Sequence, residues 1–105
     1  MRPVDITLTA PGTSAWVPLD VTQNPASISI GCRVIGTATY GVEYTYDDPF
    51  NTTPVAFGYL TQIPSGSTAN KDVIGLTGPV RAVRLNASAA ATGGVKMTVL
   101  QGLGL

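Results

Sequence analysis

The chain has 105 residues and a formal net charge of zero, and only 11% of its residues are charged, against roughly a quarter in ordinary soluble domains. This length predicts a single domain over residues 1–105. A surface with so few charges repels other chains only weakly, so the composition favours association. The weak field argues against a nucleic-acid partner, and no apolar run reaches the roughly 18 residues of a membrane helix, so we expect no membrane contact either.

Prolines and glycines separate short runs of β-branched and aromatic residues along the whole chain. This pattern is typical of an all-β fold, an antiparallel β-sandwich or jelly-roll-like barrel of about seven to eight short strands. Residues 4–10 alternate and predict a strand with one wet face, whereas Pro18 makes residues 15–19 an edge strand because it has no amide hydrogen to donate. Residues 27–34 predict a central strand in which Cys32 is a small buried hydrophobe.

The middle of the chain predicts a strand followed by loops. Residues 39–47 alternate and carry several tyrosines, and residues 55–60 alternate again, so both predict strands. Residues 61–77 are the least regular part, with a short strand expected only at 72–74. We therefore expect this segment to be the mobile loop, if the chain has one.

The last two runs predict a hairpin. Residues 80–87 and 95–100 each alternate, and the small, Gly-rich residues 88–94 connect them. The alternation places four apolar side chains on one core face and two cations in water. The apolar set is Val83, Leu85, Met97 and Val99, and the cations are Arg84 and Lys96.

Residue types that carry catalysis are scarce. The chain has no histidine to act as a base, and its single cysteine excludes an intrachain disulfide. Glu43 and Asp47 lie four residues apart on one predicted strand, roughly 13 Å along it, which exceeds the roughly 5 to 9.5 Å that glycoside hydrolysis uses. We therefore expect a non-enzymatic protein with no catalytic residue and no cofactor.

The sequence Asp47-Asp48-Pro49 predicts a turn, because Asp side chains cap the local backbone and proline fixes φ. The same carboxylates, together with the backbone of residues 50–51, offer the oxygen ligands that calcium prefers in loops. No Asp-x-Asp-x-Asp-Gly loop is present. The expectation is a capped turn without a metal, with a calcium site as the alternative.

Aromatic side chains are the strongest candidates for a binding surface. Tyr40, Tyr44 and Tyr46 share one face of a predicted strand, and Trp16 lies elsewhere in the chain. Aromatic side chains on a strand serve equally as sugar platforms and as protein hot spots. The competing interpretation is a core face whose hydroxyls reach its rim. We expect that arrangement for most of the stripe, with one or two rings at a subunit contact.

Arg81 and two leucines complete the predicted contact set. Arg81 shares the parity of the buried side of its strand, so it lies at the exposed start of the strand or pairs with an acid of this chain or of a neighbour. The tail that contains Leu103 and Leu105 is glycine-rich yet apolar. We expect it to find a partner because it is too flexible to fold alone and too apolar for water.

Three stretches resemble the small all-β structural proteins encoded among the head and tail genes of tailed bacteriophages. They are ITLTAPGTSAWVPLD, GTATYGVEYTYDD and GPVRAVRLNASAAATGGVKMTVLQG, and together they cover more than half of the chain. The resemblance is to a style of sequence and supplies no site motif, so no functional residue is carried over from it.

The resemblance implies a virion protein made in the host cytoplasm, commonly a capsid decoration or cement protein. Such a protein stabilises the head by binding the major capsid protein as a dimer, a trimer or a symmetric array. The alternative is a carbohydrate- or receptor-binding module of a phage fibre or tail component, with Trp16 and the tyrosines as platforms.

Overall fold

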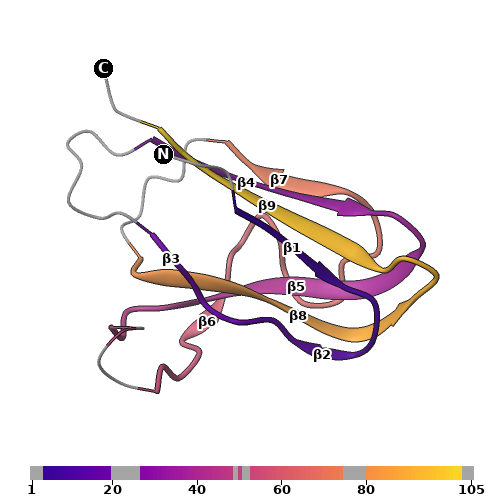
Figure 1. Ribbon diagram of the computed structural model, residues 1–105, viewed down its shortest axis with the longest axis horizontal. Helices are drawn as coiled ribbons and strands as arrows, with labels where there is room; N and C mark the ends of the chain where they lie inside the picture. The colour runs from indigo at the N-terminus through magenta and orange to yellow at the C-terminus, as the bar shows by residue number, and fades with distance from the viewer. Residues whose placement is uncertain (1–3, 20–26, 49, 51–52, 75–79, 103–105) are drawn as a thin grey trace.

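The computed structural model describes residues 4–19, 27–48, 50, 53–74 and 80–102, and it shows a sandwich of two antiparallel sheets (Figure 1). The first sheet has the order β1-β9-β4-β7, and the second has the order β2-β8-β5-β6 with β3 also paired to β8. The strands are β1 (Val4–Leu8), β2 (Gly12–Thr13), β3 (Val17–Pro18), β4 (Ser27–Val34), β5 (Thr37–Thr45), β6 (Gly58–Tyr59), β7 (Lys71–Val73), β8 (Ala82–Ala91) and β9 (Val95–Gly102).

The predicted all-β sandwich is confirmed, with nine strands in the described residues because several are only two residues long. No helix that could span a membrane occurs among these residues. Three connections lie at one end of the sandwich, and each carries the chain from one sheet to the other: β1 to β2, β4 to β5, and β8 to β9 (Figure 1).

Most of the alternating runs form strands where the sequence predicts them. β4 lies between β9 and β7 and pairs with β9 along its whole length, which confirms it as a central strand. β3 pairs only with β8, so the edge position that Pro18 predicts is also confirmed. Cys32 of β4 is buried, and burial raises the pKa of its thiol to about 12, so this side chain is an inert apolar filler.

The core lies between the inner faces of the two sheets. Four side chains that the alternation assigns to the core are fully buried, which confirms that assignment: Val83, Leu85, Met97 and Val99. Apolar side chains of β4 and β5 complete the layer, and those of β1 pack against it half-buried. Burial of this apolar surface supplies the main driving force for folding.

The predicted hairpin is wrong, because β8 and β9 lie in different sheets. β8 pairs with β5, β2 and β3, whereas β9 pairs with β1 and β4. Thr92, Gly93 and Gly94 between them have φ values of 57°, 95° and 65°. Three successive left-handed residues bend the chain out of the second sheet and into the first. The core assignment holds because alternation fixes which side chains point inward, whichever strand is the partner.

The segment after β5 differs from its prediction. Only Gly58 and Tyr59 form a strand within the predicted run 55–60. Residues 60–67 follow the edge of β5, where Val42 N donates to Ile63 O and Ser67 exchanges two backbone hydrogen bonds with Tyr40. The predicted mobile loop is therefore bound to the sheet over this part, and its expected short strand is β7; residues 75–77 lie outside the described residues.

Candidate functional site

Three aromatic rings form a cluster at the end of β5. Tyr44 is the last tyrosine within the strand, Tyr46 follows it, and Phe57 precedes β6. The Tyr46 and Phe57 ring centroids lie 4.9 Å apart with an edge-to-face geometry, and Tyr44 lies 5.6 Å from Tyr46 and 6.0 Å from Phe57. Edge-to-face pairs at these separations attract one another, so the rings hold a common position. We call these three residues the aromatic cluster.

Most of this cluster faces water. The Tyr46 side chain is 49% exposed and the Phe57 side chain is 70% exposed, whereas Tyr44 is half-buried against the core. Val55 and Phe50 in the same loop are also exposed. Scattered exposed apolar residues are normal on protein surfaces, but here the two exposed rings also contact one another.

Hydrogen bonds fix the loop that carries the cluster. Thr45 Oγ1 donates to Val55 O at 2.9 Å and accepts from Asp47 N at 3.0 Å, while Val55 N donates to Asp47 Oδ2 at 3.0 Å. Phe57 N donates to Tyr44 O at 2.8 Å. Because both ends of the loop are bound to β5 or to each other, the backbone that carries the exposed rings is ordered before a partner binds, which lowers the entropic cost of binding.

The predicted turn at Asp47 and Asp48 is confirmed as a capped turn. Asp47 caps Val55 N, and Asp48 Oδ1 accepts from Phe50 N at 2.9 Å. Arg81 Nη2 lies 3.8 Å from Asp48 Oδ2, with its side chain 49% exposed just before β8. Arg81 therefore combines both predicted alternatives, an exposed strand start and an acid of this chain. Among the described residues, no group of three or more acidic, cysteine or histidine side chains could hold a metal.

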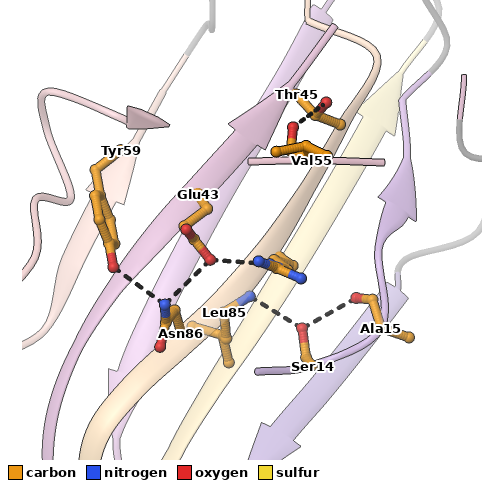
Figure 2. Close-up of polar contacts among 9 residues, drawn as sticks. Ser14, Ala15, Glu43, Thr45, Val55, Tyr59, Leu85 and Asn86 are labelled. Carbon is orange, nitrogen blue, oxygen red and sulfur yellow. Dashed lines mark hydrogen bonds and ion pairs between the residues drawn. The ribbon is translucent and has the colours of Figure 1, made fainter. Parts of the chain in front are cut away.

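A polar network crosses the outer face of the second sheet (Figure 2). Glu43 Oε1 accepts from Arg84 Nε at 2.9 Å and from Asn86 Nδ2 at 3.2 Å, and Asn86 Nδ2 also lies 3.1 Å from the Tyr59 hydroxyl. Glu43 is buried and Arg84 is largely covered, so the expectation that Arg84 stays in water is wrong. Every partner in this network is another part of the chain, which indicates a structural role.

Gly41 permits the ring of Tyr59 to lie across β5. A Cβ at Gly41 would lie 2.7 Å from Tyr59 Cδ1 and 2.9 Å from Ser65 Cα. This close approach covers the network from solvent and explains why Glu43 is buried on the outer face of a sheet.

Trp16 belongs to the edge of the same network. The Arg84 guanidinium carbon lies 4.5 Å from the centroid of the Trp16 ring, in a cation–π arrangement. One face of the indole is thus occupied within the chain. Trp16 is half-buried, and its interaction stabilises β3 against β8.

The structure brings together only some of the predicted contact residues. Tyr44 and Tyr46 lie in the aromatic cluster and Arg81 lies beside its loop, whereas Trp16 lies in the polar network. Leu103 and Leu105 lie outside the described residues.

The prediction that Tyr40 contacts a partner is wrong. Its side chain is only 1% exposed, so it fills the core and no partner can contact it. Its hydroxyl donates to Ala69 O at 2.6 Å. Burial, with a smaller contribution from Cys32, raises the pKa of this hydroxyl to about 12.

Phe57 is the site residue that sequence reasoning missed. The run 55–60 predicts a strand in which Phe57 shares a face with Val55 and Tyr59. Pro54 precedes this run and Gly58 lies within it. They were the available signal, because both residues weaken a strand and favour an irregular path. The irregular path turns the Phe57 ring toward Tyr46 and leaves it exposed.

Two solved structures show a distant likeness to the chain. No family model matches the chain, and no curated protein matches it. Among solved structures, a protein from the disulfide-linked pili of Bacillus endospore appendages is 24% identical, with a TM-score of 0.47 over 98% of this chain and 87% of that one. The coat protein of Tobacco streak virus is 14% identical, with a TM-score of 0.26 over 98% of this chain and 88% of the other. Both overlaps are too loose to establish a shared fold, so the function is inferred from this chain's own residues.

Proposed function

We propose that the chain is a non-enzymatic structural protein of a tailed-phage virion, a capsid decoration or cement protein that binds the major capsid protein. The observation that carries the proposal is the aromatic cluster, in which two exposed rings lie on a hydrogen-bonded loop of a chain with few charges. Such a surface buries apolar area on a partner at small entropic cost. The resemblance to phage head and tail proteins supplies the class of partner.

The rest of the chain suits a role in a shell. The sandwich has a continuous core and edges that are short strands, and its polar network is closed within the chain. A protein of this kind stabilises a capsid by binding at many equivalent positions, which shifts the shell toward its assembled state by mass action. The symmetry of the shell then imposes dimers, trimers or a regular array on the bound chains.

The competing function, a carbohydrate- or receptor-binding module, uses aromatic platforms. Arg84 occupies one face of Trp16, so that function would depend on Tyr46 and Phe57. The two functions share a surface but differ in what is lost when it is changed. The cement function predicts weaker heads, and the receptor function predicts failed adsorption.

The test uses phage that lack the chain, with purified protein added back to their filled heads. Wild-type protein is expected to raise the temperature and the osmotic shock that the heads survive, with adsorption to cells unchanged. The variant Phe57→Ser is expected to fold normally, because exposed substitutions usually change stability by about 0.5 kcal/mol or less, yet to fail to protect the heads.

The matched control is Ile74→Ser, which removes an exposed apolar side chain away from the cluster and is expected to protect heads like wild type. Unchanged head stability together with lost adsorption would overturn the cement function in favour of receptor binding. Full protection by Phe57→Ser would show that the aromatic cluster is not the docking surface.

A further inference from the structure

Two cations of neighbouring strands face one open depression in the first sheet, the sheet that does not carry the aromatic cluster. The depression has a volume of about 490 Å³ and lies over β4, β9 and β7. Its lining includes Arg33 of β4, Lys96 of β9 and Lys71 of β7. Gly31, Cys32, Asn70, Asp72 and Thr98 complete its lining. Lys71 is the register partner of the buried Cys32, so its side chain lies on the core side of β7. We call this surface the cationic depression.

These cations differ from the other cations in the described residues. Arg81 pairs with Asp48, and Arg84 pairs with Glu43. Within the part of the chain that the structure describes, Arg33, Lys71 and Lys96 make no ion pair. Arg33 and Lys96 therefore face the depression without an ion-pair partner.

The arrangement is unfavourable for the isolated chain. Arg33 and Lys96 are direct cross-strand partners in the register of β4 and β9. Like charges directly opposite one another destabilise a sheet. Two acids lie on the same face but form no ion pair with these cations: Asp72 lies in the lining, and Asp5 of β1 accepts a hydrogen bond from Thr98 Oγ1 at 2.7 Å. A ligand with negative charge would relieve the repulsion.

We propose that the cationic depression binds an acidic peptide segment of a partner protein, with its carboxylates held by Arg33 and Lys96. The Arg33 guanidinium can bind a carboxylate through two parallel hydrogen bonds, and the Lys96 ammonium adds a point charge beside it. Asn70 Oδ1 accepts from Val34 N at 2.8 Å, which leaves the NH₂ group of this amide to donate to a ligand.

A nucleic acid fits this surface poorly. A duplex carries one charge about every 1.7 Å along its axis, and Asp72 and Asp5 would repel such a continuous line of phosphates. Single strands bind through stacked aromatic side chains as well as cations, and the lining contains no aromatic residue. Separate carboxylates on a flexible peptide can instead contact the cations and avoid the two acids.

The test is an NMR titration of the full chain with a capped tetraglutamate peptide, with a capped tetraglutamine peptide and a thymidine oligonucleotide as comparisons. We expect saturable shifts of the Gly31, Lys71 and Thr98 amides with tetraglutamate only. The double variant Arg33→Gln/Lys96→Gln should lose about tenfold or more in affinity, the loss that one charge-assisted hydrogen bond would give. Its melting temperature should equal or exceed that of wild type, because the like-charge pair is gone.

The control Arg81→Gln also removes one exposed cation and is expected to bind tetraglutamate like wild type. Phe57→Ser should do so as well, so a failure here and a failure of the capsid-docking function are distinguishable. The inference is overturned if tetraglutamate gives no saturable shifts at the depression, if Arg33→Gln/Lys96→Gln binds it as wild type does, or if the oligonucleotide binds more tightly than the peptide.

Discussion

Gly94→Ala is expected to lower the free energy of unfolding by about 4 kcal/mol or more, in the exceptional range for a single substitution. Gly94 has φ 65°, in the left-handed region, and a Cβ there would lie 1.7 Å from Leu8 O and 2.9 Å from Thr9 Cα. Both contacts are to backbone, so they can be relieved only if the end of β1 or the start of β9 moves.

Gly94 also forms hydrogen bonds with the β4–β5 connecting segment and with the end of β8. Its carbonyl accepts from Ile35 N at 2.8 Å and from Gly36 N at 3.2 Å, and its amide donates to Ala91 O at 3.1 Å. A displacement at this residue therefore disturbs the β4–β5 and β8–β9 crossovers together. Typical domains are stable by only about 5–15 kcal/mol, so the variant should be close to unfolding.

Urea denaturation followed by circular dichroism measures this effect. The matched control is Gly31→Ala, because a Cβ at Gly31 meets nothing within 4 Å and its φ is not positive. That variant is expected to gain about 0.4–1 kcal/mol from the reduced entropy of its unfolded chain. A Gly94→Ala protein as stable as Gly31→Ala would contradict the tight crossover described above.

Glu43→Ala is expected to lower the free energy of unfolding by about 2–4 kcal/mol. The carboxylate accepts hydrogen bonds from both Arg84 and Asn86 in a buried position. Its removal leaves a largely covered guanidinium without its counter-charge. The Arg84 side chain is still 23% exposed, so water offsets part of the loss and the effect falls short of that for a fully buried pair.

Denaturation of four variants separates the pair from its surroundings. Glu43→Gln should recover part of the loss, since an amide oxygen still accepts a hydrogen bond. Glu43→Leu/Arg84→Met should recover most of it, because neither charge is then left alone. Asp5→Asn, which changes an exposed carboxylate on the other sheet, should stay within about 0.5 kcal/mol of wild type. Equal losses for Glu43→Ala and Asp5→Asn would refute a structural role for the network.

The strands and their inner faces could be predicted from the sequence because alternation is a local property. Along β1 and β4 more buried and more exposed residues alternate with a period of two, and Leu85 and Met97 are buried as the alternation predicts. Pairing is not local in this way. Whether residues 92–94 form a hairpin turn or a crossover depends on three successive residues with left-handed backbone. A threonine rarely adopts that conformation, so the residue type of Thr92 did not predict it.

The candidate site was predicted less completely for a similar reason. The tyrosine stripe of β5 was visible, but its burial depends on depth in the sandwich: Tyr40 lies at the centre, and Tyr46 lies past the strand end. Phe57 joins Tyr46 only because the chain between them folds back on β5. The buried pairing of Glu43 with Arg84 likewise required the cross-strand register of β5 and β8.

The number of copies of this chain in an intact, purified phage particle tests the virion function most directly. Mass spectrometry with isotope-labelled standards can measure that number relative to the major capsid protein. A decoration or cement protein occupies equivalent positions over the whole shell, so we expect on the order of hundreds of copies in a fixed ratio to the major capsid protein. A dozen copies or fewer, or none, would contradict the proposed function.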